Sequence, residues 1–337
     1  MFGFSIYKEQ YNQDYVESLK KIGITNVFVS LHVTEDLEDK SGIIDYLKFL
    51  KEQNLNLIVD ISPVTFKILS VQELKSFNIN TVRLDYGFDQ YETKELYDQF
   101  NLILNASTIT EKEISQYLDV GIKLEDVTLM HNFYPKEETA LSKARYEQLN
   151  RKFKKSGFKI LSFVPGDKVL RGPIYKGLPT VEDHRSQNFV ANCVELLESC
   201  DEVFVGDIEL SANSISDLEM LNRGVIPIRI TNINLDQKFI NTPLKIRQDS
   251  NHLNLRIENS RFELKTDTAI PSVNTLERPK GTITQDNLNS LRYNGEIMIT
   301  RQDMPAKENL NAVASVRQEY LNVLDCDLNG KTIMFTV

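Results

Sequence analysis

The sequence predicts a (β/α)8 TIM barrel of the α/β class, followed by a small β-rich domain. Eight short apolar runs fill the first two thirds of the 337 residues, and a helix-like stretch follows each of them. Such runs are typical of parallel strands buried on both faces, and eight of them predict a closed barrel. After Gly224 the pattern changes to short alternating segments separated by Asn and Gly turns. We therefore expect a barrel over residues 1–230 and a second domain over 235–337.

The first predicted strand lies at the N-terminus, and the strand–helix units repeat at about 20 to 45 residues, as expected of barrel units. In chain order they are FGFSIY, VFVSLHV, LNLIVDISP, TVRLDYG, FNLILNAS, VTLMHNFYP, FKILSFVPG and EVFVGDIELS. Amphipathic stretches predict helices over 14–23, 41–55, 110–121, 140–157 and 184–200. Thr110 and Glu113 have capping-box spacing, and Gly23, Gly121 and Gly157 are typical helix ends. In the second domain we expect strands within 239–249, 253–262, 294–303 and 331–337, and a helix-like stretch over 309–324.

Composition and motifs exclude several classes of function. The formal net charge of −9 disfavours nonspecific binding to nucleic acid or to an anionic membrane. Three cysteines without metal-type spacing predict neither a metal centre nor a disulfide framework. No Walker, GxGxxG, GxSxG or HExxH motif occurs, so no cofactor is expected. The first residues lack a basic segment followed by a long apolar segment, and no run of roughly 18 apolar residues occurs. We therefore expect a cytoplasmic protein without a signal peptide or a membrane partner.

Polar side chains stand where the predicted strands end. In a barrel the carboxyl ends of the strands form the active site, so these residues are the first candidates for chemistry. The set contains four carboxylates, two histidines, an arginine and three other polar residues. Its members are Ser30, His32, Asp60, Arg83, Asp85, Asn105, His131, Asn132, Asp207 and Glu209.

Four carboxylates in this set are candidate catalytic residues. Asp207 and Glu209 are two residues apart, so on a regular strand both face the mouth, and neighbouring acids push their pKa values apart. The plainer interpretation is a pair of solvated loop acids. Asp60 and Asp85 lie in apolar runs, where an unpaired carboxylate is costly. Arg83 precedes Asp85 on the same face, so a structural ion pair competes with a catalytic or ligand-binding role.

Two further groups are candidates for binding substrate. His131 and Asn132 are adjacent, so only one of them faces the interior of a regular strand, and a structural histidine is the alternative for His131. The long connection after the seventh strand carries cations that suit an anionic ligand, although such clusters are usually solvated. These loop candidates are Arg171, Lys176, His184 and Arg185.

Five motifs in order make the chain resemble the bacterial 6-phospho-N-acetylmuramidases. They are MFGFSIY, HNFYP, RGPIYKGLPTVEDHR, RPKGTIT and RYNGEI, and they extend over essentially the whole chain. The resemblance implies a TIM barrel followed by a cyclophilin-like domain. It also implies a cytoplasmic glycosidase of peptidoglycan recycling, during cell-wall turnover. Its substrate would be N-acetylmuramic acid 6-phosphate–N-acetylglucosamine (MurNAc 6-phosphate–GlcNAc), formed during phosphotransferase uptake, and its products the two sugars.

The implied reaction needs an acid at the glycosidic oxygen and stabilisation of an oxocarbenium-like transition state. In a substrate-assisted route, Asp207 would orient the 2-acetamido group and Glu209 would protonate the leaving oxygen. In the alternative, Asp60 or Asp85 acts with Asp207 or Glu209. The phosphate or lactyl carboxylate would meet the loop cations, with Arg278 or Arg292 of the second domain as further candidates.

Competing hypotheses are a barrel lyase or isomerase acting on a sugar phosphate, and a noncatalytic sugar-phosphate binder. The sequence leaves open whether the protein forms a homo-oligomer.

Overall fold

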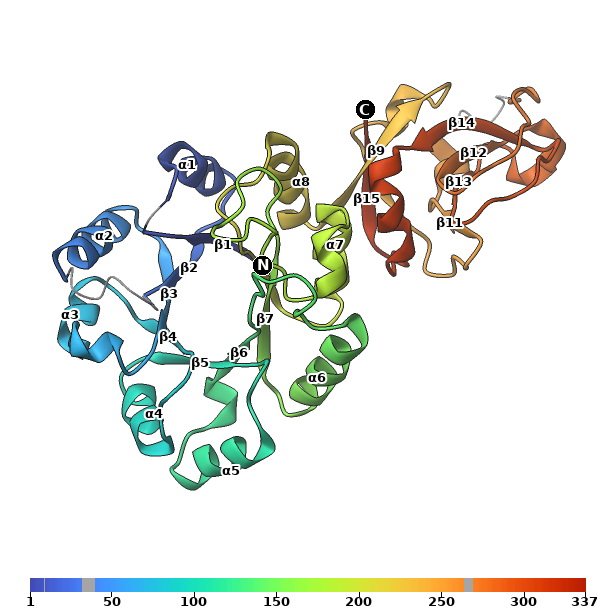
Figure 1. Cartoon of the computed structure of the whole chain (residues 1–337). Helices are drawn as coiled ribbons and strands as arrows, with labels where there is room; N and C mark the ends of the chain where they lie inside the picture. The colour runs from blue at the N-terminus through green and yellow to red at the C-terminus, as the bar shows by residue number, and fades with distance from the viewer. Residues whose placement is uncertain (9, 32–39, 264–268) are drawn as a thin grey trace. The chain divides into compact units, whose positions relative to one another are not determined.

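The first part of the chain is a closed eight-stranded parallel barrel, as predicted. The computed structural model describes residues 1–8, 10–31, 40–263 and 269–337. Each strand pairs with the next, and the eighth pairs with the first, so the strands form the ring at the centre of Figure 1. The strands are β1 (Phe2–Ile6), β2 (Asn26–Ser30), β3 (Asn56–Ile61), β4 (Thr81–Leu84), β5 (Asn101–Asn105), β6 (Thr128–Met130), β7 (Lys159–Val164) and β8 (Glu202–Val205).

Helices alternate with the strands and surround the ring (Figure 1). The capping box of Thr110 and Glu113 is present at the start of α5, and Gly23, Gly121 and Gly157 have positive φ after helix ends. The helices are α1 (Gln13–Lys21), α2 (Lys40–Glu52), α3 (Val71–Ser76), α4 (Gln90–Tyr97), α5 (Glu111–Asp119), α6 (Lys143–Lys155), α7 (Phe189–Leu197) and α8 (Ala212–Asn222). Short 3-10 helices span Thr65–Lys67, Leu124–Asp126, Glu182–Arg185, Gln237–Phe239, Ser260–Glu263, Leu288–Tyr293 and Gln318–Asp325.

The interior of the barrel is a packed apolar core. Phe28, Phe163 and Phe204 are buried together with Ile103, Met130 and Leu161. The ring of Phe204 fills the space beside Gly3, where an added Cβ would lie 2.3 Å from it. Because such interiors are close-packed, truncating one of these aromatic side chains to Ala is expected to cost about 3–5 kcal/mol.

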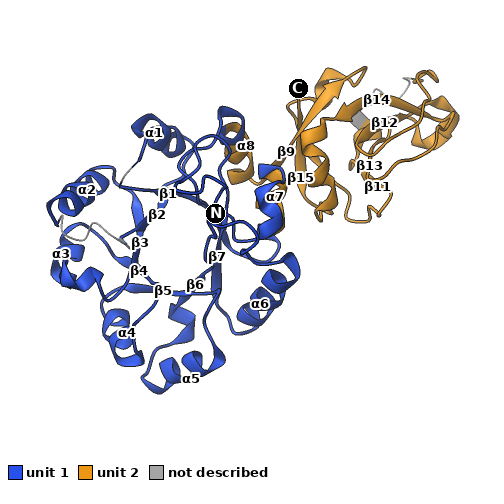
Figure 2. Cartoon of the chain, viewed as in Figure 1, with its two compact units in different colours: residues 1–189, 196–215 blue, residues 190–195, 216–337 orange. Residues whose placement is uncertain are grey.

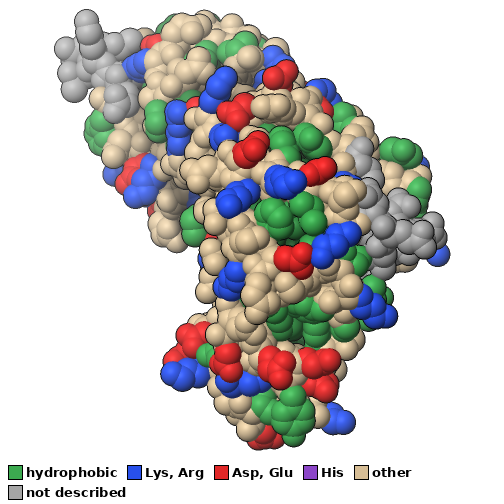
Figure 3. Space-filling view, turned by 90° about the vertical axis from the view of Figure 1, so that its left-hand side faces the viewer, with side chains coloured by type: hydrophobic (Ala, Val, Ile, Leu, Met, Phe, Trp, Pro, Cys, Tyr) green, Lys and Arg blue, Asp and Glu red, His purple; other side chains and the backbone are tan. Residues whose placement is uncertain are grey.

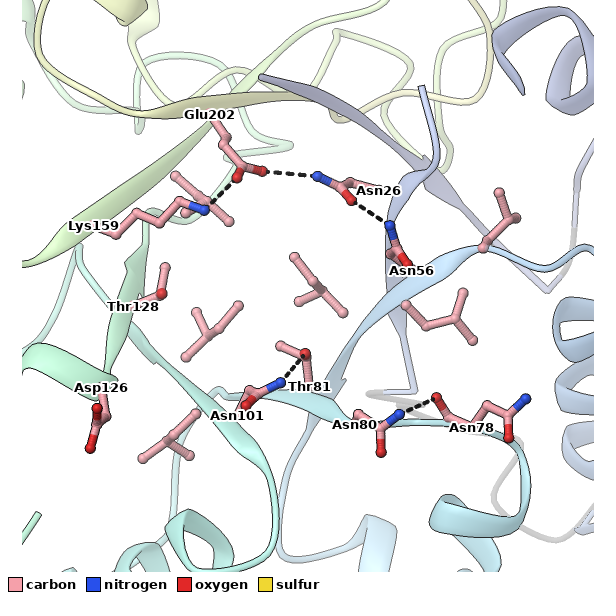
Figure 4. A pocket seen from close by; sticks show the side chains of 16 residues that line it. Asn26, Asn56, Asn78, Asn80, Thr81, Asn101, Asp126, Thr128, Lys159 and Glu202 are labelled. Atoms are coloured by element: carbon pink, nitrogen blue, oxygen red, sulfur yellow. Dashed lines mark hydrogen bonds and ion pairs between the residues drawn. The ribbon is translucent and has the colours of Figure 1, made fainter. Parts of the chain in front are cut away.

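Polar side chains close the amino end of the barrel. Figure 4 shows this end, where the first residues of several strands surround a cavity of about 400 Å³. Glu202 accepts hydrogen bonds from Lys159 (2.5 Å) and Asn26 (3.2 Å), and Asn56 donates to Asn26 (3.1 Å). The amino end of a barrel usually contributes stability, whereas chemistry belongs to the opposite end. We therefore interpret this ring as a polar cap with a structural role.

The second part of the chain is a separate seven-stranded mixed sheet, ordered β10-β15-β9-β14-β12-β13-β11. Within the predicted helix-like stretch 309–324, the structure has a strand followed by a 3-10 helix. That expectation was wrong for its first half, because Leu310–Val316 pairs with β12 and β9 and is largely buried. The strands are β9 (Val225–Asn232), β10 (Pro243–Lys245), β11 (Asn254–Arg256), β12 (Thr282–Asp286), β13 (Ile297–Thr300), β14 (Leu310–Val316) and β15 (Thr332–Thr336).

The chain divides into two compact units, coloured in Figure 2. The first comprises 1–189 and 196–215, and the second 190–195 and 216–337. The sequence placed the boundary at 230–235, whereas β9 belongs to the second sheet and Asp217 of α8 pairs with Arg229 in that unit (3.1 Å).

Two surface properties bear on the classes of partner. On the face drawn in Figure 3, basic and acidic side chains are interspersed over the described residues. Among the helices that the structure describes, none is long and apolar enough to cross a membrane.

Candidate active site at the carboxyl end of the barrel

A pocket of about 320 Å³ opens at the carboxyl end of the barrel strands. It brings together several of the predicted site residues, from β2, β3 and β4 and from the segments after β4, β6 and β7. Three aromatic rings form part of its wall. The lining residues are Phe28, Ser30, Asp60, Arg83, Asp85, Asn132, Phe133, Phe163 and Arg171.

The buried guanidinium of Arg83 organises the two carboxylates of this pocket. Its Nη1 lies 2.6 Å from Asp60 Oδ1 and 3.7 Å from Asp85 Oδ1, and its Nη2 donates to Asn132 Oδ1. The two carboxylate oxygens are therefore separated by no more than the sum of those two distances. The Asp85 side chain keeps 23% of its surface exposed, against 9% for Asp60. Of the two, Asp85 has more bonding capacity left for a ligand.

Aromatic rings and one cation form another part of the pocket wall. Phe133 and Phe163 meet edge to face, with ring centroids 5.1 Å apart. The Arg171 guanidinium lies 3.9 Å from the centroid of the Tyr7 ring, and stacking of this kind holds an arginine without neutralising it. No carboxylate of the described chain forms an ion pair with Arg171. This arginine is therefore the cation of the pocket that remains available to an anionic ligand.

Asp207 lies beneath the loop that follows β7. It is fully buried, and its carboxylate accepts hydrogen bonds from the backbone N–H groups of Gly166, Arg171 and Leu178, each at 2.9 Å. Burial raises the pKa of this carboxyl, while the three N–H groups act in the opposite direction. With its oxygens committed to the loop backbone, Asp207 holds the segment that carries Arg171 and does not line the pocket.

Glu209 is also committed to protein partners. Its carboxylate accepts hydrogen bonds from Asn12 (2.8 Å), the N-cap residue of α1, and from Lys168 (2.5 Å). Burial opposes ionisation, but the bonds from Lys168 and Asn12 outweigh it and lower the pKa of Glu209. The geometry thus gives Glu209 a role in joining α1 to the loop after β7.

His131 and Asn132 lie on opposite sides of the barrel wall. Asn132 lines the pocket, whereas His131 is fully buried against α6, where its Nε2 lies 2.7 Å from Asn150 Oδ1. Burial lowers the pKa of His131 to about 4, so the imidazole is neutral at pH 7. This placement favours the structural interpretation of His131.

The other cationic candidates of the loop differ in how many protein partners they have. Arg185 donates to Glu182 and to backbone carbonyls, including those of Gly177 (2.9 Å) and Tyr134 (2.9 Å), and so joins two loops. His184 is fully buried. Lys176 is half-exposed and lies 3.6 Å from Glu137.

The remaining predicted site residues lie at the pocket, in the second unit or outside the described residues. Ser30 lines the pocket, Asn105 donates to Asn132 (3.0 Å), and His32 lies outside the described residues. In the second unit, Arg278 is buried and donates to the carbonyl of Pro305, and Arg292 is exposed beside Tyr293. Sequence reasoning missed the aromatic wall, Tyr7, Asn12 and Ser107. The phenylalanine after His131-Asn132 was the available signal for part of that wall.

Comparisons with known proteins decide the family. A model described as the N-terminal part of 6-phospho-N-acetylmuramidase matches residues 2–220, and a C-terminal counterpart matches 226–336. The chain belongs to the 6-phospho-N-acetylmuramidase family. That family name denotes a glycosidase acting on a phosphorylated sugar, and it confirms the resemblance seen in the sequence.

Solved structures share the whole architecture. A conserved Enterococcus faecalis protein with an unknown function is 28% identical, with a TM-score of 0.84 over 99% of this chain and 96% of its own. An uncharacterized B. cereus protein is 21% identical, with a TM-score of 0.81 over 99% and 98%, and shows the same fold. No curated protein matches the chain.

Proposed function

We propose that this member of the 6-phospho-N-acetylmuramidase family is a cytoplasmic hydrolase that splits MurNAc 6-phosphate–GlcNAc into its two sugars during peptidoglycan recycling. One observation carries the proposal. The pocket at the barrel mouth places the carboxylates of Asp60 and Asp85 in the same cavity as Arg171, a cation without a carboxylate partner in the described chain. Glycoside hydrolysis needs the carboxylates, and a phosphorylated sugar needs the cation.

The geometry supports Asp60 and Asp85, rather than Asp207 and Glu209, as the reacting carboxylates. The Asp207 carboxylate accepts hydrogen bonds from three backbone N–H groups. The Glu209 carboxylate accepts hydrogen bonds from Asn12 and Lys168. In this proposal Asp85, the more exposed acid of the pocket, protonates the glycosidic oxygen. Asp60, ion-paired with Arg83, supplies negative charge to the oxocarbenium-like transition state.

The pocket suits one phosphorylated amino sugar at a time. Its volume of about 320 Å³ lies at the lower end of the range of small-molecule sites. Phe133 and Phe163 offer apolar surface to a sugar ring, and Arg171 matches the 6-phosphate through a guanidinium fork. We assign the MurNAc 6-phosphate residue to this pocket and the GlcNAc residue to its open side.

The deciding experiment is mass spectrometry of the purified protein incubated with MurNAc 6-phosphate–GlcNAc and, separately, with the unphosphorylated disaccharide. We expect the two free sugars from the phosphorylated substrate alone. Cleavage of both substrates at equal rates would refute the phosphate role of the pocket. A folded protein that cleaves neither would refute the glycosidase proposal, and conversion of a monosaccharide phosphate would then support the lyase or isomerase alternative.

Single-residue variants in the same assay distinguish the proposed roles of the pocket residues. Asp85→Asn is expected to abolish turnover while leaving the melting temperature within a few degrees, because this side chain is partly exposed and its contact to Arg83 is long, at 3.7 Å. Arg171→Gln is expected to raise KM for the phosphorylated substrate, whereas Arg223→Gln, which removes an exposed arginine of the second unit, serves as the matched control. Undiminished turnover in Asp85→Asn would overturn the catalytic assignment.

A further inference from the structure

The side-chain amide of Asn132 has a fixed orientation in the pocket. Its Oδ1 accepts from Arg83 Nη2 and also from Asn105 Nδ2 at 3.0 Å. Arginine can only donate, so the carbonyl end of the amide must face Arg83. The Nδ2 group then points away from both partners, and within the described chain it has no hydrogen-bond acceptor. Because Asn132 is a lining residue, this NH2 group is available to a molecule in the pocket.

A partly buried hydrogen-bond network behind the barrel wall holds the backbone of Asn132. Ser107 Oγ accepts from the Asn132 backbone N–H (2.9 Å) and lies 3.2 Å from His131 Nδ1. Asn150 donates through Nδ2 to Ser199 (3.1 Å), so its Oδ1 is the acceptor for His131 Nε2. These roles define one tautomer of neutral His131, with the proton on Nε2 and with Nδ1 accepting from the Ser107 hydroxyl.

The charged groups near Asn132 determine which kind of substrate oxygen can accept a hydrogen bond from its NH2 group. Among the described residues, the carboxylate of Asp60 lies 2.6 Å from the Arg83 guanidinium and balances its charge, and the carboxyl group of Asp85 lies 3.7 Å from the same guanidinium. A phosphate or carboxylate of the substrate would find no unmatched cation here, whereas Arg171 has no carboxylate partner in the described chain. An uncharged oxygen, such as an acetamido carbonyl or a sugar hydroxyl, needs no cation and can accept directly from the Asn132 NH2 group.

We propose that Asn132 binds the substrate as a hydrogen-bond donor to an uncharged oxygen of the amino sugar, and that Ser107 and His131 are positioning residues for it. This inference rests on the proposed hydrolase function. Within this hydrogen-bond network, Asn132 is the residue that contacts the uncharged oxygen of the substrate. Ser107 and His131 act through its backbone, and Asn105 and Arg83 act through its carbonyl.

The test uses Asn132→Asp in the full-length protein with MurNAc 6-phosphate–GlcNAc. Aspartate keeps an acceptor for Arg83 and Asn105 and removes the donor, so we expect kcat/KM to fall about ten- to hundredfold with an unchanged melting temperature. A substrate analogue with a hydroxyl in place of the acetamido group identifies the acceptor. If the acetamido carbonyl is the acceptor, Asn132→Asp and the wild-type protein should act on the analogue at similar rates. If a hydroxyl is the acceptor, the deficit should persist.

Ser107 variants test the positioning role. Ser107→Ala should lower kcat severalfold at saturating substrate, and Ser107→Thr, which retains the hydroxyl, should restore it; a purely structural role would lower stability without this pattern. Wild-type cleavage together with wild-type kcat/KM in folded Asn132→Asp would overturn the inference and leave the hydrolase proposal standing. Absence of wild-type cleavage would overturn both.

Discussion

The buried imidazole of His131 should make the stability of the barrel depend on pH in a defined window. In the folded protein its pKa is lowered from 6.5 to about 4, chiefly by burial. The unfolded chain therefore takes up a proton near pH 6.5, whereas the folded chain resists protonation until about pH 4. Stability from this group is fully present above pH 6.5 and is lost as the pH falls toward 4. With 1.36 kcal/mol for each pKa unit, the loss amounts to about 3 kcal/mol.

The measurement is urea unfolding of the wild-type protein and of His131→Gln at pH 7, 5.5 and 4.5. Glutamine does not titrate, so the gap between the two proteins should narrow steadily as the pH falls, by up to the amount worked out above. A His252→Gln variant, which removes an exposed imidazole of the second unit, is the control for loss of a histidine as such. NMR titration of the imidazole protons supplies the pKa directly. A gap that stays constant from pH 7 to 4.5 would refute the assignment of His131 as a buried neutral group.

Three other substitutions probe the loops around the site. Asp207→Asn turns one acceptor into a donor that faces backbone N–H groups, so we expect a loss of about 1–3 kcal/mol and faster proteolysis of 166–178. Gly166→Ala places a Cβ 2.8 Å from Asp207 Cβ and 2.9 Å from a backbone carbonyl oxygen, which should lower the melting temperature, and an unchanged one would contradict the close approach. Arg185→Lys loses the fork on Glu182, whose pKa the Arg185 hydrogen bonds lower to about 2. The stability gap to wild type should therefore be largest above pH 4.5 and shrink toward pH 2 in acid-unfolding curves.

The architecture could be predicted because periodicity and topology together leave few alternatives. Eight apolar runs with intervening amphipathic helices favour a closed barrel, and the carboxyl ends of the strands then meet at one mouth. In the second unit the same reasoning failed for 310–316, because Leu310–Val316 has apolar residues compatible with either element, and pairing with β12 decided for a strand. Long-range pairing of this kind has no local signature in the sequence.

The site was harder to predict than the fold because strand alternation ends where the strand ends. β8 stops at Val205, so Asp207 and Glu209 lie on a loop, and their spacing does not make them face the same way. Their partners, Gly166, Leu178 and Asn12, come from distant segments that the sequence does not place beside them. At His131, by contrast, the backbone N–H still bonds to the carbonyl of Leu161 in β7 (2.9 Å), and the side chains of His131 and Asn132 lie on opposite sides of the wall.

The acids at the barrel mouth divide into two groups by the bonding capacity that the protein leaves unused. The Asp207 carboxylate accepts three backbone N–H groups and is fully buried, so a ligand could reach it only by breaking the loop that it holds. One of those N–H groups belongs to Arg171, so the acid whose position suggested a catalytic role helps to hold the backbone of an arginine that lines the pocket. Asp85 has a longer contact to Arg83 and an exposed edge on the pocket, and it therefore retains oxygen atoms for chemistry. In this mouth the carboxylate with fewer protein partners is the better candidate for proton transfer, because general acid catalysis requires direct contact with the substrate.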